Sequence, residues 1–231
     1  MKASKQHSTA ILIFANSSYE EIRHKKISCG EPLFDALTQQ ILKTVEKTKI
    51  PFFHLTEVEQ KGTYFGERFA NAIQSVFEKG FEKIITVGND SPHLTKAHLL
   101  SALSQLESGK SVIGPSADGG FYLMGMHRSD FKKYDFEKLS WQTSKIRKEV
   151  IDLLSSRSTE INLLPKLFDI DSLWDVKILA KNASRLAKTI AEAILSILPC
   201  KTKIEIPSFF LYDGFHSQTL FNKGSPIPVL S

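Results

Sequence analysis

Apolar and polar positions along the chain follow two different periods. Short continuous apolar runs are typical of strands buried on both faces, and they occur at residues 10–15, 51–55, 83–87, 111–113, 121–126 and 160–164. Between these runs the apolar residues recur at helical spacing, which predicts helices over residues 32–47, 65–78, 95–107, 144–154 and 172–180. This alternation is typical of βαβ units. It predicts an α/β fold with three layers, α/β/α, around a mainly parallel, mixed sheet.

The last fifty residues follow a different pattern. Helical spacing over residues 182–198 ends at Pro199, and the segments "KIEI" and "SFFLYD" have the composition of short strands. The remaining residues are loop-like but retain apolar side chains, which usually pack on their own domain or on a partner. We therefore expect an α/β domain over residues 1–181 and an extension over residues 182–231. The extension would pack on this domain or on a second subunit of a homodimer.

Composition excludes several classes of protein. The 231 residues are 42% hydrophobic, enough for a sizeable core, and the net charge of +5 is mild and spread along the chain. The densest basic run, residues 23–26, is too short to indicate nucleic-acid binding, and no apolar segment is long enough to span a membrane. Cys29 and Cys200 provide neither a disulfide framework nor a zinc pattern. We expect a cytoplasmic protein without nucleic-acid or membrane partners.

Acidic residues follow three of the predicted strands. Asp90 lies in "GNDSP", Asp118 in "GPSADGG", and Asp169 and Asp171 in "LFDIDSL". Parallel strands bind ligands at their carboxyl ends, and Mg²⁺ and Mn²⁺ take carboxylate, phosphate and water oxygens as ligands. Each aspartate also suits a turn or a helix start. Taken together, their shared position favours a metal-dependent site for an anionic small molecule.

Other residues fit the same site, although each has a structural alternative. Arg68, at the start of the helix predicted over residues 65–78, would contact a phosphate or a base, or would pair with a neighbouring carboxylate. Trp141 would stack on a base or sugar, or would plug an apolar gap. Gly119 and Gly120 allow a ligand to approach the backbone closely, or they form a hairpin turn between two strands.

Five segments of the chain match the motifs of a known family in order and spacing. They are "QKGTYFGERFANA", "IITVGNDSPHL", "VIGPSADGGFYLMGM", "LSWQTS" and "LFDIDSLWDV", and together they extend over about residues 10–180. They resemble a bacterial GT-A-like family, the radical-SAM/selenodomain-associated or arsenosugar-type glycosyltransferases. The resemblance implies a nucleotide-diphospho-sugar transferase fold, which is similar to that of several nucleotidyltransferases.

The resemblance also implies a reaction and its residues. A glycosyl or nucleotidyl group would pass from a nucleotide or nucleotide-sugar donor to a small acceptor. Asp90 and Asp171 match the aspartates that would hold Mg²⁺ or Mn²⁺, and Asp118, Gly119 and Gly120 would line the acceptor or sugar side. Asp118 is the first candidate for a general base.

The loop after the first strand departs from the family. The family pattern F-A-K-x-P-x-x-G-x-x-K-T-R-L is replaced by "FANSSYEEIRHKKI", in which Glu20 and Glu21 would repel phosphates. The candidate nucleotide contacts that remain are Ala15, Asn16, Arg23, Lys25 and Lys26. Two hypotheses stay open: a metal-dependent transferase, or a catalytically silent member of the family that acts as a binding or scaffold protein.

Overall fold

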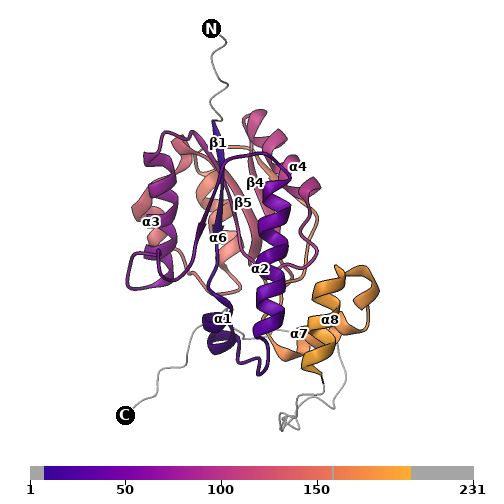
Figure 1. The fold of residues 1–231 in the computed structure, drawn as a ribbon. Helices are drawn as coiled ribbons and strands as arrows, with labels where there is room; N and C mark the ends of the chain where they lie inside the picture. The colour runs from indigo at the N-terminus through magenta and orange to yellow at the C-terminus, as the bar shows by residue number, and fades with distance from the viewer. Residues whose placement is uncertain (1–7, 158, 199–231) are drawn as a thin grey trace, which may run out of the picture.

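A six-stranded sheet forms the centre of the protein, as Figure 1 shows for a computed structural model that describes residues 8–157 and 159–198. Its strands run in the order β2-β1-β3-β5-β4-β6. They are β1 (Thr9–Phe14), β2 (Phe52–Leu55), β3 (Lys83–Val87), β4 (Ser111–Pro115), β5 (Phe121–His127) and β6 (Ile161–Leu163). Strand β5 is antiparallel to both of its neighbours, and all other pairs are parallel. The predicted mixed, mainly parallel sheet is confirmed.

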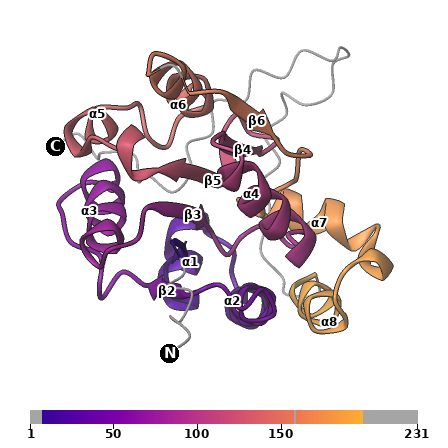
Figure 2. The same ribbon diagram turned by 90° about the horizontal axis from the view of Figure 1, so that it is seen from above.

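Helices cover both faces of this sheet (Figure 2). One face carries α3 (Phe65–Glu78), α5 (Lys133–Glu137) and α6 (Ile146–Ser155), and the other carries α2 (Glu31–Glu46) and α4 (Lys96–Glu107). Successive side chains of a strand point to opposite faces. Accordingly, Leu12 of β1 belongs to the first core, whereas Ile11 and Ile13 belong to the second. The predicted three-layer α/β/α class is confirmed.

A third apolar cluster lies beside the sheet and joins helices from both ends of the described chain. It unites α1 (Ser18–Lys25) and α2 with α7 (Leu173–Ala180) and α8 (Lys188–Ile197). Short 3-10 turns occur at Arg128–Asp130 and Ala183–Arg185. Because α8 packs on α2 (Figure 1), residues beyond 181 contribute to a core shared with the α/β domain. The division of the chain at residue 181 remains a prediction.

Two helix starts and one hairpin are formed as the sequence predicts. Thr95 begins α4 with a capping box that His98 completes, and Ser172 begins α7 with one that Asp175 completes. Strands β4 and β5 pair as an antiparallel hairpin. The continuous helix predicted over residues 182–198 is wrong, because Leu186 is extended and packs on the third cluster between the last 3-10 turn and α8.

The strand-like segments at 203–206 and 208–213 lie outside the described residues. Among the residues that the structure describes, none of the helices has the length and apolar character needed to cross a membrane.

Candidate functional site

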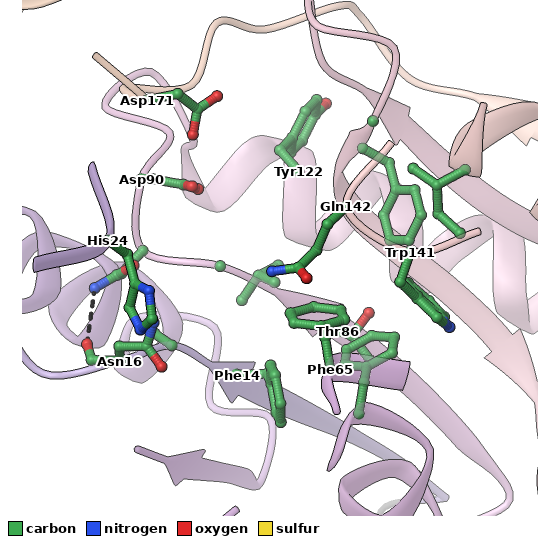
Figure 3. Close-up of a pocket in the computed structure, with 18 of the residues that line it drawn as sticks. Phe14, Asn16, His24, Phe65, Thr86, Asp90, Tyr122, Trp141, Gln142 and Asp171 are labelled. Carbon is green, nitrogen blue, oxygen red and sulfur yellow. Dashed lines mark hydrogen bonds between the residues drawn. The ribbon is translucent and has the colours of Figure 1, made fainter. Parts of the chain in front are cut away.

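A cavity of about 180 Å³ lies at the carboxyl ends of β1 and β3 (Figure 3). The chain leaves β1 toward β2 on one side and returns to β3 on the other, so these strands flank a topological switch point, where α/β sheets bind ligands. The pocket gathers most of the residues that the sequence singles out: Ala15, Asn16, Lys25, Arg68, Asp90, Asp118, Gly120, Trp141 and Asp171. These residues come from segments far apart in the chain.

The segment after β1 forms a helix, α1, where the family resemblance implies a phosphate-binding loop. Ser17 caps this helix by accepting the N–H of Glu20 at 3.4 Å. Ser17 also donates its own N–H to Oε2 of Glu57 at 2.7 Å and its hydroxyl to Oε1 at 2.6 Å. Burial alone would raise the pKa of Glu57, but these bonds outweigh it and lower the pKa. A carboxylate of the protein therefore already accepts both donors of the residue that caps α1.

Lys25, in the last turn of α1, points into a group of carboxylates. Its Nζ lies 2.9 Å from Asp90 Oδ2, 3.3 Å from Asp171 Oδ1 and 3.5 Å from Glu21 Oε2, and it donates to the carbonyl oxygen of Ile170 at 2.6 Å. We call Glu21, Asp90 and Asp171 around this ammonium the carboxylate cluster. Burial would lower the pKa of Lys25, yet the three negative charges outweigh it and raise the pKa well above its usual value. Lys25 is thus a fixed cation.

Two side-chain amides hold the start of this segment in place. Asn16 donates from Nδ2 to Oε1 of Glu21 at 3.1 Å, and the Glu21 side chain is buried. Asn89 is also buried, and its Nδ2 donates to Thr38 Oγ1 at 3.0 Å and to the carbonyl oxygen of Asn16 at 3.4 Å. Asn89 therefore ties the end of β1 to α2, while its neighbour Asp90 faces the pocket.

An aromatic wall stands across the pocket from Asp90 and Asp171, built by Phe14, Phe65 and Trp141 (Figure 3). The ring centroids of Phe65 and Trp141 are 5.4 Å apart, and Trp141 donates from Nε1 to the carbonyl oxygen of Phe136 at 2.6 Å. At Gly66, a Cβ would lie 2.5 Å from Trp141 Cδ1. Trp141 is consequently anchored, and it offers an apolar surface rather than a free polar group.

The loop between β4 and β5 supplies Asp118 to the pocket rim. Asp118 is exposed, and its Oδ1 accepts the N–H of Gly120 at 3.0 Å and the hydroxyl of Ser116. Gly119 does not line the pocket. It has φ +92°, and a Cβ there would lie 2.5 Å from the carbonyl oxygen of Ser144, so the backbone requires glycine for packing.

Two predicted nucleotide contacts lie away from the pocket. The side chain of Arg23 is 64% exposed and pairs with Glu20 at 2.7 Å, and Lys26 ends α1 in the left-handed conformation without lining the pocket. Conversely, two residues at the site were not singled out from the sequence: Gln142, which lines the pocket, and Glu57, which bonds to Ser17 beside it. Gln142 lines the pocket with φ +61°. Gln142 follows Trp141 in the motif "LSWQTS", so its position could have been noticed, whereas Glu57 belongs to none of the five motif segments.

The residues present do not fit the divalent metal that the fold family implies. Asp90 and Asp171 do come together, as the sequence predicts, but the Lys25 ammonium lies between their carboxylates. Within residues 8–157 and 159–198, no group of three or more His, Cys, Asp or Glu side chains is arranged to hold a metal ion. The positive charge at this position comes from the chain itself.

Comparisons with known proteins support the fold. Residues 36–143 match the family model described as "Uncharacterized protein conserved in bacteria (DUF2064)". A search of curated proteins found no match. A crystal structure from Desulfovibrio desulfuricans G20, named as a candidate nucleotide-diphospho-sugar transferase, is 21% identical and superposes with a TM-score of 0.72 over 83% of this chain and 99% of that chain. This likeness confirms the predicted nucleotide-diphospho-sugar transferase-like fold. It concerns the fold and does not extend to activity.

More distant structures resemble the protein only loosely. The 4-diphosphocytidyl-2C-methyl-D-erythritol synthase of Anaerococcus prevotii DSM 20548 is 11% identical, with a TM-score of 0.47 over 77% of this chain and 96% of its own. A Mycobacterium tuberculosis H37Rv protein in complex with manganese is 13% identical, with a TM-score of 0.42 over 75% of this chain and 98% of its own. At these scores, neither structure supports a conclusion about activity or metal binding.

Proposed function

We propose that this protein binds a small polar molecule in its pocket, and that it is silent as a transferase for a metal-bound nucleotide donor. One observation carries the proposal: Ser17, the residue that caps the start of α1, already donates its N–H and its hydroxyl to Glu57. A nucleotide phosphate needs such donors at a helix start. A diphosphate would have to displace a carboxylate that two short hydrogen bonds hold.

The charge of the site supports the same function. The pocket is acidic on balance. Its charged lining includes four carboxylates and two cationic side chains: Glu21, Asp90, Asp118, Asp171, Lys25 and Arg68. Like charges at close range repel strongly in a partly buried site. This net negative charge disfavours the diphosphate of a nucleotide donor and favours a neutral or cationic ligand.

The size and walls of the pocket define the ligand further. Pockets that hold drug-sized molecules typically enclose roughly 300–1,000 Å³, whereas this one encloses about 180 Å³. One side offers carboxylate oxygens of Asp90 and Asp171, and the other offers the rings of Phe14, Phe65 and Trp141 (Figure 3). A small polyhydroxylated molecule or a small amine combines the hydrogen-bond donors and the apolar face that these walls match.

Group transfer is the second candidate, because the cationic side chain of Arg68 in the pocket leaves one hydrogen-bond donor unused. Nε of Arg68 is buried without a hydrogen-bond partner among the described residues, as expected of a group that awaits an anionic ligand. In this candidate an acceptor oxygen bonds to the glycosyl or nucleotidyl group of a nucleotide donor. The donor's bond to its nucleoside diphosphate or pyrophosphate breaks, this group leaves, and Asp118 accepts the acceptor's proton. The Mg²⁺ or Mn²⁺ expected from the sequence would then require Lys25 to leave Asp90 and Asp171. The narrower resemblance to arsenosugar-type glycosyltransferases belongs to this candidate.

Thermal unfolding with a panel of monosaccharides, polyols and small amines tests the binding function. A ligand that binds only the folded state stabilises it by about 2.7 kcal/mol at a hundred times its dissociation constant. We expect at least one such molecule to stabilise the wild-type protein, and Asp90→Asn to remove this stabilisation. A panel without any stabilising member would contradict the proposal, and so would a ligand whose effect survives Asp90→Asn.

A further inference from the structure

Oxygen atoms of the protein surround the ammonium group of Lys25. The side chain is 9% exposed, and Nζ contacts Asp90, Asp171 and Glu21 in addition to its bond to the carbonyl oxygen of Ile170. An ammonium has three N–H donors, and four oxygen-bearing groups surround this one. Lys25 is therefore held from several directions, and not by a single surface ion pair.

The groups around Lys25 are of the kind that a hard divalent cation takes as ligands. Mg²⁺ binds carboxylate and carbonyl oxygens together with water, and this site offers three carboxylates and one carbonyl oxygen. In the structure, the centre of these oxygens is occupied by Nζ, at distances of 2.6 Å to 3.5 Å. The distances from Nζ to these oxygens are those of hydrogen bonds and ion pairs, and they are longer than the Mg²⁺–ligand distance of about 2.1 Å.

We propose that Lys25 is the permanent cation of this site and replaces the divalent metal of the fold. This inference deepens the proposed function and rests on it, since a site with a fixed ammonium does not recruit a metal-bound donor. Lys25 excludes a divalent ion in two ways. It fills the space between Asp90 and Asp171, and its positive charge repels a second cation at close range.

The proposal has a direct consequence for a variant. Removing the ammonium takes away the cation that Glu21, Asp90 and Asp171 share around one position, and like charges at close range repel one another. A divalent cation that enters this position relieves the repulsion. Lys25→Ala should therefore create a metal site that the wild-type protein lacks.

Titration with Mn²⁺, followed by electron paramagnetic resonance, measures this property in the full chain without any nucleotide. We expect no bound Mn²⁺ in the wild-type protein at millimolar concentration, and one bound ion per chain in Lys25→Ala. Lys43→Ala is the matched control, because Lys43 also lies in the last turn of a helix and is exposed. This control removes the same charge and should bind no Mn²⁺.

Two results would overturn the assignment of Lys25. One is a wild-type protein that binds Mn²⁺ and loses it in Asp90→Asn, and the other is Lys25→Ala without a bound ion. Should Lys25→Ala not fold alone, Lys25→Gln keeps a polar side chain, and Mn²⁺ should raise its melting temperature but not that of the wild type. The Mn²⁺ titration contains no nucleotide, so a negative result would contradict the role of Lys25 alone. The role of Glu57 is tested separately, by nucleotide binding.

Discussion

Glu57 joins two segments that lie forty residues apart in the sequence. Its carboxylate accepts both the N–H and the hydroxyl of Ser17, at 2.7 Å and 2.6 Å. Hydrogen bonds to an ionised group are stronger than neutral ones, and this pair fixes the start of α1 to the loop after β2. In the binding function that we propose, this pair is the contact that a phosphate at the start of α1 would have to displace.

Glu57→Gln should lower the free energy of unfolding by about 1 kcal/mol at neutral pH, because glutamine is uncharged and offers Ser17 one acceptor oxygen where Glu57 offers two. The pKa of Glu57 is lowered in the folded state. Its stabilising contribution is therefore complete above the unfolded pKa and is lost as the pH falls through the folded pKa. Urea unfolding from neutral to acidic pH should show the two proteins converging in acid.

The same substitution at an exposed ion pair is the control for Glu57. Glu160 is 70% exposed and pairs with Lys110, and exposed pairs contribute about 0–1 kcal/mol. Glu160→Gln should change the free energy of unfolding much less than Glu57→Gln does. Equal effects would mean that the bonds to Ser17 add nothing beyond surface charge.

At the scale of helices and loops, the ends of strands were the most predictable part of the site. Asp90, Asp118 and Asp171 meet in one pocket because the strands that precede them end at the same edge of the sheet. Helix α1 was missed, since its polar sequence has no apolar stripe, and its stability comes from the Ser17 cap and from contacts with α2. The direction in which Lys25 points depends on that helix, so it could not be predicted either.

The loop between β4 and β5 offers a test of backbone packing. Gly119 and Gly109 have similar positive φ values, +92° and +85°, but only at Gly119 would a Cβ meet another residue, 2.5 Å from the carbonyl oxygen of Ser144. Gly109→Ala should cost about 1–2 kcal/mol for the left-handed backbone alone. Gly119→Ala should cost clearly more in urea unfolding, and an equal cost would show that the contact with Ser144 is unimportant.

At the scale of the whole molecule, the third apolar cluster joins the last described helix to the sheet domain. Ile190 and Ile194 of α8 are completely buried against α2 and α7. The sequence predicted an apolar extension, but its periodicity could not show which helix it would cover. Because α8 shares a core with α2, we expect both to unfold in one cooperative transition.

Ile194→Ala should lower the free energy of unfolding by about 2–5 kcal/mol, the usual cost of emptying a buried aliphatic position. The neighbouring residue provides the control, since Leu195 is 53% exposed. Leu195→Ala should have a much smaller effect in the same urea titration. A separate early transition in Ile194→Ala would instead show that α8 is an independent unit, consistent with a boundary near residue 181.

The central claim is that the site supplies its own ions, with Lys25 as the cation and Glu57 as the carboxylate at the start of α1. Thermal unfolding of the full chain with nucleotides and with UDP-, GDP-, ADP- and CMP-sugars, each with and without Mn²⁺, tests it most directly. We predict no stabilisation by any of these donors, whether or not Mn²⁺ is present. A donor that raises the melting temperature only together with Mn²⁺ would contradict the claim and would establish metal-dependent group transfer as the better hypothesis.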